Sequence, residues 1–220
     1  MQPAAALIAY TFEGEYRHRE YYLELRSIGK DGLMGAGKPV NVKFIRLLME
    51  NFSAVSPSVP HGELPKGMLY ADVRAGKYVW YRPPCRKYLY FSSVLNIPNG
   101  EYSLPGLVWT VRDESLYMFA YRAKRLSSGT QLYSAPFFNV RPCTGSVCMG
   151  NAKSHLPEIL TFNGFIKYWE DRFFLSEFSH ILGSNPTRNN LILVLKKSVH
   201  SFDRDELTPV KKLKLKDLLK

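Results

Sequence analysis

The stretch Asn139-Val-Arg-Pro-Cys-Thr-Gly-Ser-Val-Cys-Met-Gly150 follows the apolar run Leu132-Tyr-Ser-Ala-Pro-Phe-Phe138. It places an asparagine and two thiols just beyond a run whose composition predicts a β-strand. Cys148 follows an apolar residue and lies close to a glycine that lets the backbone turn, whereas Cys143 lies between proline and threonine in an exposed turn. The stretch therefore predicts a nucleophile loop at the end of a strand, with Cys148 as the nucleophile.

Short strand-like runs precede this loop, separated by turn sequences rich in Pro, Gly, Asn and Ser. They occupy residues 67–73, 77–82, 89–93, 106–111, 116–122 and 131–139. Consecutive strands with short links favour an antiparallel meander over parallel strand-helix-strand units. The predicted fold class is α+β, an antiparallel β-meander with flanking helices.

Residues 1–60 predict a β-β-α subdomain that precedes the meander. Residues 7–12 and 21–28 are rich in aromatic and aliphatic side chains, and the second run alternates between polar and apolar residues. The two runs therefore predict a hairpin. Residues 42–52 carry apolar side chains at the spacing of one helical face, which predicts a helix.

A glycine-rich segment between that hairpin and that helix, Gly32-Leu-Met-Gly-Ala-Gly-Lys38, has the spacing of a phosphate-binding loop. In such a loop the next residue is Ser or Thr, whose hydroxyl binds magnesium, and here it is Pro39. Proline also lacks the amide that a phosphate oxygen needs at the start of a helix. A flexible connector is therefore the favoured interpretation, and nucleotide binding is the alternative.

The proline-rich residues 53–65 separate this subdomain from a second predicted domain, residues 61–200, which a basic tail over residues 201–220 follows. Within the second domain, residues 165–182 predict a helix with a broad aromatic face, and residues 191–195 predict a strand. The leucine spacing of the tail fits either closure of the domain or a surface helix that binds a membrane or a partner. Closure is the favoured interpretation.

The composition indicates a folded protein with a basic surface. Of the 220 residues, 45% are hydrophobic and 14% aromatic, which is enough for a sizeable core. The sequence shows neither a transmembrane run nor a secretory signal, so a cytoplasmic location is expected. The formal net charge of +11 suits nucleic acid or an acidic partner. Because the basic residues are scattered and no nucleic-acid recognition motif accompanies them, a basic solvated surface or a docking face for an acidic partner is favoured.

The three cysteines, an odd number, fit reduced thiols better than a disulfide framework. Cys143, Cys148 and the nearby His155 could begin a zinc site, but a fourth ligand is not evident and structural zinc sites use more closely spaced pairs. No metal or cofactor is therefore predicted. Cys85 follows two prolines in a predicted turn and is interpreted as an ordinary exposed or half-buried thiol.

The cysteine loop resembles that of ubiquitin-conjugating enzymes, which carry His-Pro-Asn, a short turn, glycine, a small apolar residue and the catalytic cysteine. The corresponding residues here are Phe137-Phe138-Asn139 and Gly145-Ser146-Val147-Cys148. The chain is most similar to prokaryotic members of that superfamily, family D, which include the protein B family of the PRTRC cassette. This similarity covers residues 62–180 and includes the motifs GELPKGMLY, YVWYRPP and WEDRFFLSEFSH.

The resemblance implies a ubiquitin-conjugating fold and a transferase that carries a ubiquitin-like protein as a thioester on Cys148. It also implies a ThiF-type activating enzyme, a JAB-type isopeptidase as a neighbour and a lysine amine as the acceptor. It assigns Asn139 to stabilising the oxyanion that forms during transfer. The alternative is that Asn139 caps a turn, where Asn is common.

Two departures from the family pattern affect this assignment. Phe137 and Phe138 replace His-Pro, so packing must fix the loop in place of a histidine hydrogen bond. The residues after Cys148 lack an acid that could help deprotonate the incoming lysine, and Glu158 and His180 are the candidates for that role. A histidine near a helix end is also simply favoured by the helix dipole. The remaining alternatives are a non-catalytic adaptor for the activating enzyme or modifier, and a nucleic-acid-binding protein of a plasmid cassette.

Overall fold

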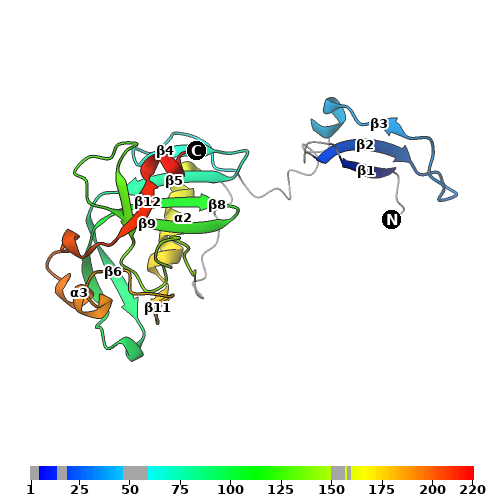
Figure 1. Ribbon diagram of the computed structural model, residues 1–220. Helices are drawn as coiled ribbons and strands as arrows, with labels where there is room; N and C mark the ends of the chain where they lie inside the picture. Colours follow the sequence, from blue (N-terminus) through cyan, green and yellow to red (C-terminus); the bar gives the residue numbers. More distant parts are fainter. Residues whose placement is uncertain (1–4, 14–18, 47–58, 150–156, 158–159) are drawn as a thin grey trace. The chain divides into compact units, whose positions relative to one another are not determined.

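The computed structural model of the chain describes residues 5–13, 19–46, 59–149, 157 and 160–220. The chain divides into two compact units, residues 1–57 and residues 58–220. The described residues form both helices and strands, and the strands pair antiparallel apart from one short parallel pair (Figure 1). The fold class is therefore α+β, as predicted.

The first unit contains a three-stranded antiparallel sheet of β1 (Ala5–Glu13), β2 (Arg19–Ser27) and β3 (Lys38–Pro39). β1 and β2 pair along their whole length, which confirms the predicted hairpin, and β3 is an addition to the prediction. Residues 42–46 are helical, and the rest of the helix predicted over residues 42–52 lies outside the described residues.

The glycine-rich residues 32–38 begin in a turn and continue into the returning arm of a second hairpin, which the sequence did not predict. Ile28 forms a β-bridge with Met34, and the Gly35 amide donates to the Ser27 carbonyl at 2.8 Å. Because strand pairing engages this backbone, the segment lacks the open concavity of amides that cradles a phosphate.

The second unit is built on a six-stranded antiparallel sheet in the order β12-β10-β9-β8-β5-β4 (Figure 1). Its strands are β4 (Met68–Asp72), β5 (Lys77–Arg82), β8 (Gly106–Arg112), β9 (Ser115–Tyr121), β10 (Gln131–Ser134) and β12 (Pro209–Lys214). From β8 to β10 the spatial order follows the chain, which confirms the antiparallel meander.

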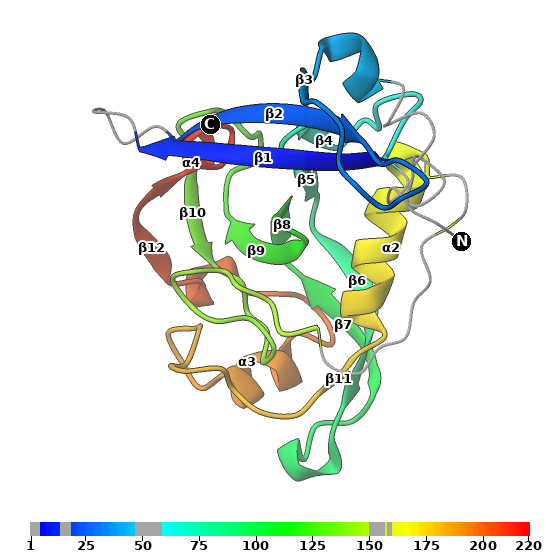
Figure 2. The same ribbon diagram turned by 90° about the vertical axis from the view of Figure 1, so that its right-hand side faces the viewer.

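Helix α2 (Phe162–Phe174) packs on one face of this sheet (Figure 2). The ring of Phe165 lies 4.4 Å from that of Tyr78, and the ring of Phe173 lies 5.4 Å from that of Trp109, measured between centroids. The intervening residues of the same strands form a second apolar cluster on the opposite face. The sheet thus separates two cores, and the larger one lies under α2.

A long hairpin is inserted between β5 and β8. It consists of β6 (Cys85–Phe91), the 3-10 helix η1 (Ser93–Leu95) and β7 (Gly100–Leu104). The short strand β11 (Glu177–Phe178) pairs with β6 in parallel. The sequence predicted only residues 89–93 of this hairpin as a strand. It missed β7 because this strand begins on Gly100, the last residue of the turn sequence Pro98-Asn99-Gly100.

Helix α2 ends at Phe174, so the prediction that it extends to residue 182 was wrong. The Ser176 hydroxyl donates to the Phe173 carbonyl at 2.6 Å just beyond the helix. The chain then enters β11, where Phe178 is fully buried. The aromatic residues after Phe174 therefore prolong the helical pattern in the sequence but pack through a different element.

Residues 191–195 were predicted as a strand but lie in helix α3 (Leu191–Lys197). The Asn190 side chain accepts a hydrogen bond from the Ile192 amide at 2.9 Å, and this N-cap starts the helix. The 3-10 helix η2 (Arg204–Glu206) follows.

The C-terminal segment completes the domain by adding an edge strand to the sheet, as the favoured interpretation expected. It forms β12 at the sheet edge and the short helix α4 (Leu215–Leu218), with Val210 and Leu215 buried. Among the residues that the structure describes, no helix is long and apolar enough to cross a membrane.

Candidate functional site

The two phenylalanines before Asn139 anchor the cysteine segment in the core, and each is 1% exposed. The ring of Phe137 packs edge-on against Phe173 of α2 with 5.0 Å between centroids. The ring of Phe138 packs against Phe91 of β6 at 6.1 Å. Packing thus fixes the start of the segment, as expected where His-Pro is missing.

Residues 139–148, here called the thiol hairpin, fold back on themselves. Val140 pairs with Val147, and the Cys148 amide donates to the Asn139 carbonyl at 2.8 Å. The first and last residues of the thiol hairpin therefore lie opposite each other. The sequence predicted a loop here, and backbone pairing makes it a small strand-like element instead.

The returning arm of the thiol hairpin extends the main sheet along β9. Ser146 pairs with Tyr117, and the Val147 amide donates to the Leu116 carbonyl at 3.0 Å. Because β8 pairs with one edge of β9, the arm and β10 both pair with the opposite edge of β9. Backbone hydrogen bonds thus attach the thiol hairpin to the sheet.

The tip of the thiol hairpin contains two residues with positive φ, Cys143 at +66° and Gly145 at +70°. Glycine is needed at the second position, because a Cβ there would lie 2.5 Å from the Phe119 ring and 2.8 Å from the Met118 carbonyl oxygen. Cys143 is exposed in the turn, as predicted.

Cys148 lies at the base of the thiol hairpin and is exposed. Its neighbours Val147 and Met149 are partly buried against the main core, so the backbone on both sides is anchored. A cysteine is intrinsically a strong nucleophile even when only a few per cent is thiolate. An accessible cysteine on an anchored backbone can therefore accept an acyl group.

Asn139 is 5% exposed, and its side-chain amide lies 3.5 Å from the Ser176 hydroxyl, a long hydrogen bond. No pattern in the sequence singles out Ser176, because only folding brings it to Asn139. A carboxamide has two N–H donors, and Ser176 engages one of them. This contact ties Asn139 to the segment after α2, and none of the described residues engages its second donor.

His180 lies in the loop after β11 and not at a helix end, so the interpretation that a helix dipole favours it was wrong. It is exposed, and its Nδ1 lies 2.9 Å from the Ser179 hydroxyl. Two residues later, the Leu182 amide donates to the Phe138 carbonyl at 3.2 Å. That bond places the His180 loop beside the base of the thiol hairpin.

The structure therefore brings Cys148, Asn139 and the loop that carries His180 together through backbone hydrogen bonds. Glu158 and His155, which the sequence also suggested, lie outside the described residues. In the described part of the chain, no group of three His, Cys, Asp or Glu side chains is placed to hold a metal ion.

Cys85 has a different environment at the start of β6. It is half-buried, and burial raises the pKa of its thiol. It borders a cavity of about 370 Å³ together with Arg82 and Glu170. The Glu170 carboxylate is buried and accepts hydrogen bonds from Trp80 Nε1 at 2.9 Å and from Arg82 Nε at 2.7 Å. The structure thus agrees with the interpretation of Cys85 as an ordinary half-buried thiol.

An antiparallel sheet backed by α2, with a cysteine segment hydrogen-bonded to β9, fits the class of ubiquitin-conjugating-enzyme-like α+β proteins. Comparison with known families confirms this class, because the profile of prokaryotic E2 family D matches residues 44–210, more than half of the chain. The chain belongs to that family. No curated protein matches it significantly, and no solved structure does. Membership implies a ubiquitin-like modifier and an activating enzyme as types of partner.

Proposed function

We propose that the protein accepts a ubiquitin-like modifier as a thioester on Cys148 and transfers it to an amine. The observation that carries this proposal is the exposed Cys148 at the base of an anchored hairpin, in a chain of this family. A ThiF-type activating enzyme loads the modifier, and a JAB-type isopeptidase is the expected enzyme of removal.

Loading is a thioester exchange. The Cys148 thiolate attacks the carbonyl carbon of the modifier's thioester with the activating enzyme, and the thiolate of the activating enzyme leaves. In the second step a lysine amine attacks the Cys148 thioester, loses its proton to a base and forms an amide bond as the Cys148 thiolate leaves. Neither step consumes an oxidant or a reductant.

Asn139 and His180 have separate roles in the second step. The free amide N–H of Asn139 donates to the oxyanion of the tetrahedral intermediate. His180 accepts the proton of the attacking amine, for which an imidazole is suited near neutral pH. Support for both roles comes from the backbone hydrogen bonds that join their segments to the thiol hairpin.

Incubation with the activating enzyme, ATP and the modifier tests loading. The expected result is a band shift that dithiothreitol removes and that Cys148→Ala lacks. Cys143→Ala is the matched control, because Cys143 is an exposed cysteine of the same hairpin, and it should load normally. A shift that persists in Cys148→Ala and disappears in Cys143→Ala would show that Cys143 carries the modifier.

A non-catalytic adaptor is the second candidate, and the environment of Asn139 favours it because the side chain is buried and Ser176 engages one of its two amide donors. An adaptor would bind the activating enzyme or the modifier without forming a thioester. Equal binding by the wild type and Cys148→Ala, with no dithiothreitol-sensitive shift in either, would support this candidate.

A further inference from the structure

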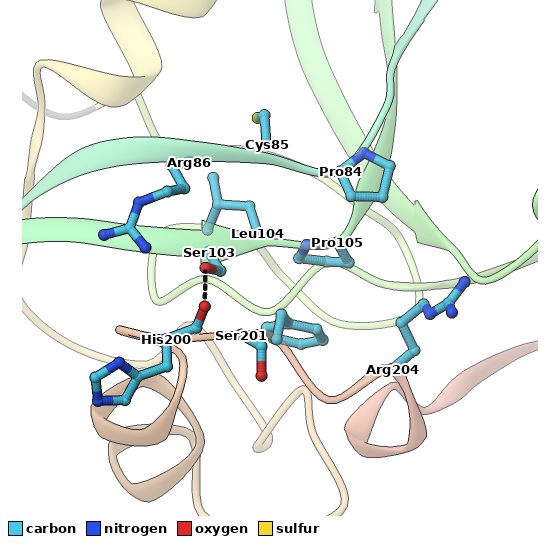
Figure 3. A pocket seen from close by; sticks show the side chains of 10 residues that line it. Pro84, Cys85, Arg86, Ser103, Leu104, Pro105, His200, Ser201 and Arg204 are labelled. Carbon is cyan, nitrogen blue, oxygen red and sulfur yellow. Dashed lines mark hydrogen bonds between the residues drawn. The ribbon is translucent and has the colours of Figure 1, made fainter.

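Two cavities of the second unit meet at Pro84 and Arg204, which line both. The first, of about 450 Å³, lies between the β6–β7 hairpin and residues 200–204 (Figure 3). The second, of about 590 Å³, lies over β5 and β9 and is bordered by residues 123–126. Each has the size of a ligand site, about 300–1,000 Å³. Together they form one extended groove, here called the basic groove.

The charged side chains that line the basic groove are all basic. They are Arg86, Lys124, Arg125 and Arg204, all of them exposed, and the exposed His200 also lines the groove. Figure 3 shows Arg86 and Arg204 at opposite ends of the first cavity. Lys124 and Arg125 have no ion-pair partner among the described residues, whereas Arg86 lies 3.3 Å from Glu101 in an exposed pair of little strength. The groove therefore favours a negatively charged occupant.

Apolar side chains form the floor of the basic groove between these charges. Pro83, Pro105, Leu126 and Phe202 contribute to it. The Ser103 hydroxyl, a polar group in the first cavity, already donates to the His200 carbonyl at 3.1 Å (Figure 3). An apolar floor between cationic ends complements an extended polypeptide that carries both acidic and apolar side chains.

Single-stranded nucleic acid is the other polyanion that a basic groove could bind, but it needs open aromatic faces for its bases. Tyr121 is 5% exposed, with its hydroxyl bonded to the Arg82 carbonyl at 3.3 Å. Tyr81 packs edge-on against Tyr121 with 6.5 Å between ring centroids. Phe202, the other aromatic residue that lines the groove, is partly buried against the main core. These features favour the polypeptide.

We propose that the basic groove docks an extended acidic segment of a partner protein. The proposal rests on charge complementarity and on the shape of two joined cavities. It goes beyond the proposed function, because no step of it uses Cys148 or a thioester.

Fluorescence anisotropy with a fluorescein-labelled peptide of alternating glutamate and leucine tests the proposal at low ionic strength. The double variant Lys124→Glu/Arg125→Glu should weaken binding by about tenfold or more, because it places like charges against the peptide. Lys66→Glu/Arg74→Glu is the matched control, since it makes the same charge change at exposed residues outside the groove. The control should change the affinity less than twofold, about the precision of such a titration.

Equal weakening in the two double variants would show that the peptide follows only the net charge, and would overturn the proposal. So would a labelled oligothymidylate that binds more tightly than the peptide and is equally sensitive to Lys124→Glu/Arg125→Glu, because that result assigns the groove to nucleic acid. The assay contains neither ATP nor activating enzyme. Its outcome is therefore separate from that of the loading experiment.

Discussion

The two regions around Cys148 and Cys85 are built in opposite ways. Cys148 is exposed at the base of a hairpin that backbone hydrogen bonds attach to β9. Cys85 is half-buried, and burial raises the pKa of its thiol. In the same region burial, and to a smaller extent the neighbouring Tyr81 and Cys85, raises the pKa of Tyr121 to about 12. The comparison teaches that Cys148 suits the proposed carrier role better than Cys85, because burial keeps a thiol protonated and less reactive.

Removal of the aromatic anchor should have the largest effect on the Cys148 region. Phe137→Ala should lower the free energy of unfolding by about 3–5 kcal/mol, because a buried ring packed on Phe173 leaves a cavity. Urea unfolding measures this loss. The control Tyr88→Ala removes an exposed ring and should change the free energy of unfolding by about 0.5 kcal/mol or less. Similar losses in the two variants would show that Phe137 is not an anchor.

Asn139→Ala should separate loading from transfer at the Cys148 region. We expect normal thioester formation and a transfer to free lysine that is about 100- to 1000-fold slower, because one oxyanion donor is lost. Single-turnover discharge on gels measures the rate. Ser176→Ala is the control, since it removes the partner of the amide but leaves the amide in place. Equal slowing in both variants would indicate that Asn139 acts only by anchoring the hairpin.

Gly145→Ala tests whether the tip of the thiol hairpin needs glycine. The substitution should cost about 2–4 kcal/mol of unfolding free energy, because it adds left-handed strain and a clash with Phe119. Thermal or urea unfolding gives the value. A Cβ at Gly129 meets nothing within 4 Å, so Gly129→Ala should be neutral within about 0.5 kcal/mol. A neutral Gly145→Ala would mean that the tip can rearrange.

The smallest effect should come from Tyr121, on the Cys85 side of the comparison. Its pKa is raised to about 12, so between pH 10 and 12 the unfolded chain releases a proton that the folded protein keeps. This group therefore lowers the free energy of unfolding as the pH rises, by about 1 kcal/mol between pH 9 and 11. In urea unfolding, Tyr121→Phe should lack this decrease of the unfolding free energy with pH, and Tyr88→Phe should retain it. An identical pH dependence of the unfolding free energy in the two variants would contradict the raised pKa of Tyr121.

Local patterns in the sequence were sufficient for the class of the fold, and they supplied the candidate site residues, whose roles stay predictions. Alternating apolar residues in short runs separated by turns predicted the β-meander, and the resemblance of the cysteine loop and of motifs such as GELPKGMLY and WEDRFFLSEFSH to known proteins predicted the family. The replacement of His-Pro by Phe137 and Phe138 predicted an anchor made by packing. Each of these features depends on residues close together in the chain, which periodicity and motifs can describe.

Only the tertiary structure decided how distant segments meet. Ser176 reaches Asn139 because α2 ends at Phe174 and the chain turns into β11, an ending that the continuous aromatic pattern concealed. Residues 191–195 suit a strand by composition, yet the cap at Asn190 and the burial of one helical face make them a helix. The basic groove likewise joins side chains from β6, a loop and η2. Such contacts arise from packing between elements far apart in sequence, and local propensity carries no record of them.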